Sequence, residues 1–277
     1  MYWQTTRFRL SLTRPLVMGI VNVTPDSFSD GGRHGTPAQA MAWCDQLVGE
    51  GADILDIGGE STRPGGRAPD LDEELRRVLP VVRHAVALGR PVSVDTSRPE
   101  VMAEAIAAGA DIVNDVRALR RPGALAVLAD APDTGVCLMH MRGEPETMQQ
   151  HTAYDDVVHD VALDLGQRMR EVVDAGVRIE RIALDPGIGF AKTAEQNWQL
   201  MRRQRELCAI GRPLLVGWSR KSSLGLLTGR AVHDRLGASV AAAVAAACLG
   251  ASVVRVHDVA ATVDALKVAA AAGLVGG

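Results

Sequence analysis

Short apolar runs that end in polar residues recur about every thirty residues along this chain. Each run is followed by a stretch of helical character, and this alternation predicts a parallel sheet. Eight such units predict an α/β fold of the (β/α)8 type, the TIM barrel, whose active site lies where the C-terminal strand ends meet. The runs end at Asn22, Asp56, Asp95, Asn114, His140, Asp185, Ser219 with Lys221, and Arg255 with His257. We therefore expect these polar side chains to share one pocket.

The expected elements fill nearly the whole chain. The strands are expected at residues 16–23, 52–59, 91–96, 111–116, 135–141, 182–185, 213–219 and 252–258. The helices are expected at residues 37–51, 72–88, 99–107, 122–131, 154–175, 194–208, 235–249 and 259–272. Residues 1–14 form a short N-terminal extension, expected as a hairpin or strand across the barrel bottom. Since no linker or low-complexity segment interrupts the pattern, residues 1–277 are predicted to form a single domain.

Composition narrows the class of protein. Hydrophobic residues make up 47% and charged residues 23%, which is typical of a soluble globular protein. A net charge of −3 without a basic cluster argues against nucleic-acid binding. No apolar run reaches the length of a membrane span, and no signal peptide is evident. The four cysteines form no C-x-x-C pair, so we expect reduced thiols and a cytoplasmic protein.

Side-chain parity predicts which strand residues face the pocket. Val253, Arg255 and His257 share one face of the last strand, because side chains alternate across a strand. Val254 and Val256 are expected on the opposite face, against helices. The same rule gives the inward sets Met18, Ile20 and Asn22; Ser93 and Asp95; Ile112 and Asn114; Cys137 and Met139; Ala183 and Asp185; Leu215, Gly217 and Ser219. The polar members of these sets are therefore predicted to converge at the barrel mouth.

Some of these residues admit two interpretations. Arg255 with His257 suits an anion, because both side chains donate hydrogen bonds. Asn22 could hold a phosphate oxygen or, through its carbonyl oxygen, a hard cation such as Mg2+. Asp56 either faces the ligand or orients a neighbour. Met139 is either barrel core or one wall for a flat ligand.

His140 and two loops complete the residue-level interpretation. His140 has the parity opposite to Met139 and is expected to be a packed core histidine rather than a catalyst. The loops at residues 24–36 and 60–70 are long and rich in Gly and Pro. Long loops at the catalytic face often close over a substrate, so both are expected to act as lids.

Eight segments carry a specific order of motifs over nearly the whole chain. They are residues 18–32 (MGIVNVTPDSFSDGG), 56–65 (DIGGESTRPG), 93–96 (SVDT), 111–116 (DIVNDV), 138–149 (LMHMRGEPETMQ), 185–192 (DPGIGFAK), 216–222 (VGWSRKS) and 255–259 (RVHDV). In all of them the chain resembles the dihydropteroate synthase family, whose two signature segments correspond to the first two. It departs from the usual pattern at Arg142, where Gln is frequent, and at Ser223, where a bulkier residue often follows.

The resemblance implies a transferase of folate biosynthesis. Such an enzyme condenses 6-hydroxymethyl-7,8-dihydropterin diphosphate with p-aminobenzoate and releases 7,8-dihydropteroate and pyrophosphate. It also implies an SN1-like step, Mg2+ as cofactor, competition by sulfonamides and a homodimer formed through late helices. The partners expected are these small molecules, with no nucleic acid and no membrane.

The resemblance also implies a role for particular residues. Pterin binding is expected from Asp95, Asn114, Met139, Asp185, Lys221 and Arg255. The p-aminobenzoate slot is expected from Phe28, Thr62, Arg63, Pro64, Phe190, Lys221 and Ser222. Diphosphate binding is expected from Asn22, Thr62, Arg255 and His257, with Asn22 also holding the metal. The expected catalytic residues are Asp95, Lys221, Arg63 and Asp26, the last of them near Mg2+ or the amine.

Two alternatives remain open at this point. A pterin-dependent methyltransferase has a similar pterin-binding barrel, but the two long loops suit a second substrate, and no cobalamin-binding segment is evident. A non-catalytic pterin-binding paralogue is the second alternative. Such a loss of activity is disfavoured by the presence of Asn22, Asp95, Arg63, Lys221, Arg255 and His257.

Overall fold

A closed parallel barrel forms the centre of the molecule. The computed structural model describes residues 1–23, 36–60 and 69–277. Eight parallel strands form one sheet in the order β8-β7-β6-β5-β4-β3-β10-β9. A parallel bridge between Leu184 and Leu214 joins β8 to the chain just before β9. The sheet thus closes on itself, which confirms the predicted barrel.

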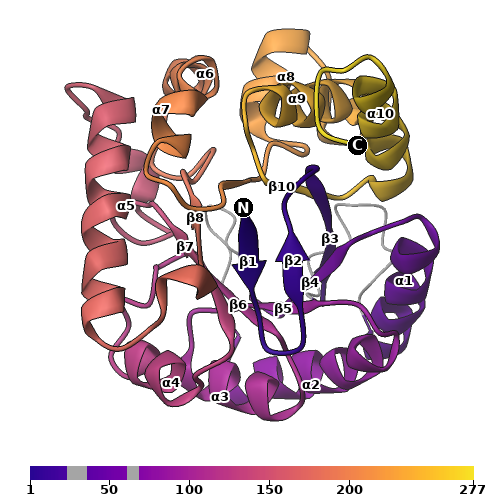
Figure 1. The fold of residues 1–277 in the computed structure, drawn as a ribbon, viewed down its shortest axis with the longest axis vertical. Coiled ribbons are helices and arrows are strands. Elements are labelled where there is room, and N and C mark those ends of the chain that lie inside the picture. Colours follow the sequence, from indigo (N-terminus) through magenta and orange to yellow (C-terminus); the bar gives the residue numbers. More distant parts are fainter. Residues whose placement is uncertain (24–35, 61–68) are drawn as a thin grey trace.

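Helices form a ring outside these strands (Figure 1). The barrel strands are β3 (Leu16–Asn22), β4 (Ile54–Gly58), β5 (Val92–Asp95), β6 (Ile112–Asp115), β7 (Gly135–Met139), β8 (Ile182–Asp185), β9 (Leu215–Val216) and β10 (Val253–Val256). The α-helices are α1 (Pro37–Gly49), α2 (Leu71–Ala87), α3 (Pro99–Ala107), α4 (Ala124–Asp130), α5 (Val157–Asp174), α6 (Ala194–Arg202), α7 (Gln204–Cys208), α8 (Ser222–Thr228), α9 (Leu236–Cys248) and α10 (Val259–Ala271). Within the described ranges, none of these helices combines the length and apolar character that crossing a membrane requires.

Local sequence explains where several helices begin. The Thr36 side chain accepts the Gln39 N–H, and the Gln39 side chain accepts the Thr36 N–H, which together form a capping box at α1. Pro37 and Pro99 occupy the first turns of α1 and α3, where a missing N–H costs nothing. The boundaries predicted from these signals are therefore close to those observed.

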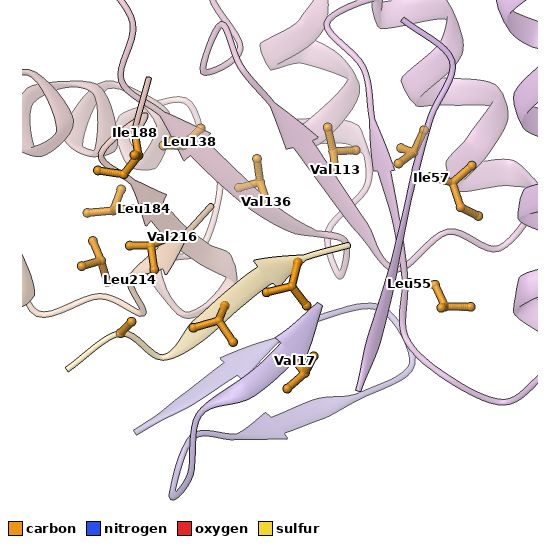
Figure 2. Packing of buried hydrophobic residues seen from close by; sticks show 14 of the residues in the cluster. Val17, Leu55, Ile57, Val113, Val136, Leu138, Leu184, Ile188, Leu214 and Val216 are labelled. Carbon is orange, nitrogen blue, oxygen red and sulfur yellow. The ribbon is translucent and has the colours of Figure 1, made fainter. Parts of the chain in front are cut away.

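Buried side chains form two layers separated by the barrel wall. The inner cluster contains Trp3, Leu16, Met18, Ile54, Ile112, Cys137, Ala183, Leu215 and Val253. The outer cluster, part of which Figure 2 shows, places Val17, Leu55, Val113, Val136 and Val216 with side chains of the surrounding helices. The inner set has the parity of Arg255 and Asp95, so the predicted alternation of faces is confirmed.

The N-terminal extension closes the bottom of the barrel. β1 (Tyr2–Gln4) pairs antiparallel with β2 (Arg9–Ser11), and Figure 1 shows this hairpin at the centre of the helical ring. Trp3 is fully buried among residues of the inner cluster, and its indole Nε1 donates to the Arg181 carbonyl at 2.7 Å. The hairpin predicted for residues 1–14 is therefore confirmed.

Three elements differ from the sequence expectation. The helix predicted at residues 194–208 is divided into α6 and α7 at Arg203, whose guanidinium bonds Asp156 and Glu206. The strand predicted at residues 213–219 is shortened to the two residues of β9, because the chain turns beyond Gly217 and reaches a positive φ of 60° at Arg220. The short helix α8 was not predicted.

Arg7 ties the hairpin to the barrel wall. Its guanidinium meets the buried Asp111 carboxylate through Nε at 3.0 Å and Nη2 at 2.7 Å. The same side chain donates to the carbonyls of Val86 and Arg90. Asp111 also accepts the Arg7 backbone N–H, so one carboxylate fixes both the backbone and the side chain of the turn.

We expect Arg7→Ala to lower the free energy of unfolding by about 2 kcal/mol, because it leaves the Asp111 carboxylate buried without its cation. Urea denaturation followed by circular dichroism measures this change. Arg178→Ala is the matched control, since it breaks an exposed ion pair with Asp133 that contributes about 1 kcal/mol or less. Equal losses in the two variants would contradict this role of Arg7.

Candidate active site

An ion-pair network across the barrel mouth is the centre of the site. Arg255 on β10 donates through Nε to Asp56 Oδ2 at 2.6 Å and through Nη2 to Asp95 Oδ2 at 2.7 Å. Asn114 on β6 donates to the same Asp56 oxygen at 3.2 Å. Four strands thus contribute one network. Asp56 Oδ2 thus orients Arg255 and Asn114, whereas Asp56 Oδ1 is buried and has no hydrogen-bond partner among the described residues.

The register of the sheet explains why these side chains meet. Asp56 pairs with Ser93, and Asp95 pairs with Asn114, in neighbouring strands of the parallel sheet. Each of the four network residues lies at or near the C-terminal end of its strand. Because the strands are parallel, their C-terminal ends reach the same face of the barrel.

Burial controls the charge of Asp95. The pKa of the Asp95 carboxyl is raised to about 7, mainly because the group is removed from water; the charge of Arg255 opposes the rise, and the nearby carboxylate of Asp56 adds to it. Burial lowers the pKa of Arg255, but the carboxylates of Asp56 and Asp95 outweigh this effect and hold the pKa well above its ordinary value. The network therefore keeps one fixed cation beside a carboxyl group that titrates near neutral pH.

A second group of expected residues lies at the end of β8 and in the segments that follow β8 and β9. Asp185 is buried, and its Oδ1 accepts the Gly187 N–H at 2.7 Å. The Lys221 ammonium lies 4.2 Å from the centre of the Phe190 ring. Burial raises the pKa of Asp185, while the Gly187 N–H, Lys221 and Arg255 oppose the rise. The structure thus brings the expected pterin and p-aminobenzoate residues into neighbouring positions.

His257 is held in place by Ser219. The Ser219 hydroxyl accepts the backbone N–H of His257 at 3.2 Å and lies 2.9 Å from its Nδ1. The hydroxyl hydrogen can be donated to Nδ1 in the tautomer of His257 that carries its proton on Nε2. The imidazole then presents Nε2 as its N–H donor, which suits an anion.

Other expected residues lie as follows. Asn22 ends β3 and is half-buried, and Ser222 is the exposed first residue of α8. Met139 ends β7, has the parity of the inner cluster and is paired with Asp185. His140 is buried, and burial followed by the charge of Lys192 lowers its pKa to about 2. The prediction that His140 is a packed histidine is confirmed.

Five expected residues lie outside the described part of the chain: Asp26, Phe28, Thr62, Arg63 and Pro64. Glu60, which directly precedes the second gap, lies 3.7 Å from Arg117, and Arg117 donates to Glu144 at 2.6 Å. Among residues 1–23, 36–60 and 69–277, no group of three or more His, Cys, Asp or Glu could hold a metal ion.

Sequence reasoning missed several residues that shape the site. Arg117 and Lys192 lie in or near recognised motifs, but nothing in their spacing indicates which partner each one meets. Asn197 on α6 accepts the Gly189 N–H at 2.9 Å and donates to Ser223 at 3.0 Å. These contacts join segments far apart in the sequence, so only the folded chain reveals them.

Comparisons with known proteins agree on one family. The family model described as "Pterin binding enzyme" matches residues 18–257. Dihydropteroate synthase of Neisseria meningitidis serogroup B is 52% identical over 278 residues, with 98% of each chain covered.

Solved structures agree with this result. A structure of Xanthomonas albilineans dihydropteroate synthase with 4-aminobenzoic acid matches with a TM-score of 0.89 and 53% identity, covering 96% of this chain and 95% of that one. The Yersinia pestis dihydropteroate synthase in complex with a sulfonamide drug matches with a TM-score of 0.95 and 44% identity, covering 99% of each chain.

Replacing Arg255 with Met is expected to raise the pKa of Asp95 above its value of about 7, because the charge that lowers this pKa is removed. A carbon-13 NMR titration of the Asp95 carboxyl measures the shift. Arg14→Met serves as control, since Arg14 pairs with Asp53 before β4, at the other end of the barrel. An Asp95 titration that Arg255→Met leaves unchanged would contradict the network.

Proposed function

Because the chain belongs to the dihydropteroate synthase family of pterin binding enzymes, we propose that it condenses 6-hydroxymethyl-7,8-dihydropterin diphosphate with p-aminobenzoate. The products are 7,8-dihydropteroate and pyrophosphate, so the protein is a transferase of folate biosynthesis. The observation that supports this most directly is the network of Asp56, Asp95, Asn114 and Arg255 at the barrel mouth.

The polar residues of the site match the edge of a pterin ring. That edge carries N–H donors, ring nitrogens and a carbonyl group, so it needs both acceptors and donors. Asp185 and Asp95 offer carboxylate oxygens to the N–H groups. The amide nitrogen of Asn114 points to Asp56, which leaves its carbonyl oxygen for a further N–H. Lys221 donates to the carbonyl or a ring nitrogen, and Met139 lies against one ring face.

The chemistry begins with cleavage of the carbon–oxygen bond between the pterin methylene and the diphosphate. The diphosphate leaves with the bonding electron pair, and Arg255 and His257 stabilise its negative charge. The carboxylate of Asp95 stabilises the cationic pterin methylene. The amine of p-aminobenzoate then attacks through its lone pair, a carbon–nitrogen bond forms, and the amine releases one proton.

The slot for p-aminobenzoate lies beside this centre. Phe190 gives an aromatic wall, and the Lys221 ammonium lies close to that ring. Lys221 and the exposed hydroxyl of Ser222 suit the carboxylate end of the substrate. Phe28, Thr62, Arg63 and Pro64 complete the slot in this proposal, with Asp26 near the amine. Closure of their two loops would exclude the water that competes for the cation.

Mg2+ fits the proposed site. An Asn22 carbonyl oxygen is a hard ligand, and Mg2+ commonly keeps waters and binds substrate phosphates alongside one or two protein oxygens. Bound there, Mg2+ would neutralise charge on the departing diphosphate. Asn22 and Asp26 are the residues proposed to hold it, and Thr62 is proposed to bind the diphosphate.

Assembly and location extend the proposal. We infer a homodimer through the late helices, because Leu226 and Leu227 on α8 and Leu236 on α9 are large apolar side chains exposed to solvent. We infer a cytoplasmic location, because Cys44, Cys137, Cys208 and Cys248 are free thiols.

The purified protein is expected to form 7,8-dihydropteroate only when Mg2+, the pterin diphosphate and p-aminobenzoate are all present, as chromatography of the reaction would detect. A sulfonamide is expected to raise the apparent KM for p-aminobenzoate without changing kcat, since both compete for one slot. Tight pterin binding without product would favour the non-catalytic paralogue or the methyltransferase. Absence of pterin binding would contradict the pocket itself.

Asp185→Asn is expected to weaken binding of the pterin diphosphate about tenfold or more, because a charge-assisted hydrogen bond is lost. The amide oxygen of the variant can still accept the Gly187 N–H, so the local backbone is preserved. Isothermal titration calorimetry measures the affinity. Asp133→Asn, an exposed carboxylate before β7, is expected to bind as the wild type does. Unchanged affinity in Asp185→Asn would remove this residue from the pterin site.

A further inference from the structure

A buried lysine follows β8 and has no role in the reaction described above. The side chain of Lys192 lies in the interior, with 3% of its surface exposed. Its ammonium lies 2.9 Å from the Phe190 carbonyl oxygen, 3.1 Å from the Gly187 carbonyl oxygen and 3.0 Å from His140 Nδ1. The His140 carbonyl oxygen lies farther away, at 3.5 Å. All four partners are neutral acceptors that surround one cation.

The three nearest acceptors match the three N–H donors of the ammonium group. A protonated lysine has three N–H donors and accepts no hydrogen bond. His140 stays neutral because its pKa is lowered to about 2, so its Nδ1 can accept from the ammonium. Burial lowers the pKa of Lys192 to about 7, and Asp185 opposes this change. A cation buried in this way needs all three acceptors in place.

The backbone that precedes Lys192 adopts a conformation with several positive φ angles. Gly187, Gly189 and Ala191 all have positive φ angles, of 69°, 82° and 51°. A Cβ atom on Gly187 would lie 2.0 Å from the His140 carbonyl oxygen, so the two segments touch there. Ile188 fixes the other side of the turn in the outer cluster, near Leu138 and Leu184 in Figure 2.

The two carbonyl groups that Lys192 holds belong to residues that border the site. The N–H of Gly187 binds Asp185, and the ring of Phe190 lies against the Lys221 ammonium. Displacement of either carbonyl would therefore move a group that contacts Asp185 or Lys221. His140, directly after Met139, anchors the same ammonium to the end of β7.

We propose that Lys192 is a positioning residue that fixes the wall shared by the pterin and p-aminobenzoate subsites, through the carbonyl groups of Gly187 and Phe190. It acts through these groups and does not touch the substrates. This inference rests on the proposed function, since it names how that same site is held in shape.

The test compares Lys192→Met with a matched control, Arg181→Met. Methionine keeps much of the bulk of lysine but has no donor. Arg181 is also a buried cation that binds carbonyl oxygens, those of Thr134 and Leu128, but it precedes β8 at the bottom of the barrel. Both variants are expected to lower the melting temperature. Lys192→Met alone is expected to raise KM for p-aminobenzoate and Kd for the pterin diphosphate, each about tenfold.

Further measurements make each outcome decisive. Lys192→Gln, which keeps two donors on a shorter side chain, is expected to give a smaller rise in KM and replaces Lys192→Met if that variant does not fold. Values of KM and Kd within twofold of wild type in the folded variant would overturn the proposal, as would equal rises in Arg181→Met. The wild-type enzyme is assayed in parallel, so absence of product there refutes the proposed function rather than the role of Lys192.

Discussion

The architecture of the core and of the site depends on one constraint: side chains alternate between the two faces of eight parallel strands. One face of each strand packs against helices, and the other enters the barrel, so the polar strand-end residues of inward parity reach the same interior. The register of neighbouring strands then determines which of these polar side chains are in contact. Because Asp95 and Asn114 are paired neighbours, and Arg255 on β10 reaches both Asp95 and Asp56, the polar contacts form one network.

Charge balance within this network explains how a polar site can be buried. Asp56 and Asp95 share the guanidinium of Arg255, and removal of that cation would leave two carboxylates close together in a medium of low polarity. The charged form of Asp185 is instead stabilised by the Gly187 N–H and by the positive charges of Lys221, Arg255 and Lys192. The site thus contains two carboxylates that share one guanidinium and a third carboxylate, Asp185, that has no direct ion pair among the described residues.

Much of this arrangement could be predicted from the sequence, and the reason is periodicity. The inward parity of Asp95, Asn114 and Arg255 follows from counting residues along each strand, and the hairpin at the barrel bottom follows from its position before the first strand. The contacts of Ser219 and Lys192 could not be predicted, because they depend on how loops from different strands pack in space. The division between α6 and α7 has the same origin, since Arg203 bonds Asp156, which precedes another helix.

The seam between β8 and β9 has a consequence for the width of the site. In the described chain these strands meet through one bridge, Leu184 with Leu214, whereas β3 and β4 pair over five positions. Side-chain packing holds this part of the wall, including the stacked rings of Trp198 and Trp218 at 4.9 Å. A local opening of the sheet between β8 and β9 would break fewer backbone hydrogen bonds than an opening elsewhere in the barrel. Asp185 and Lys221 lie on the two sides of this seam, so such a motion would change the distance between a buried carboxylate and an ammonium group.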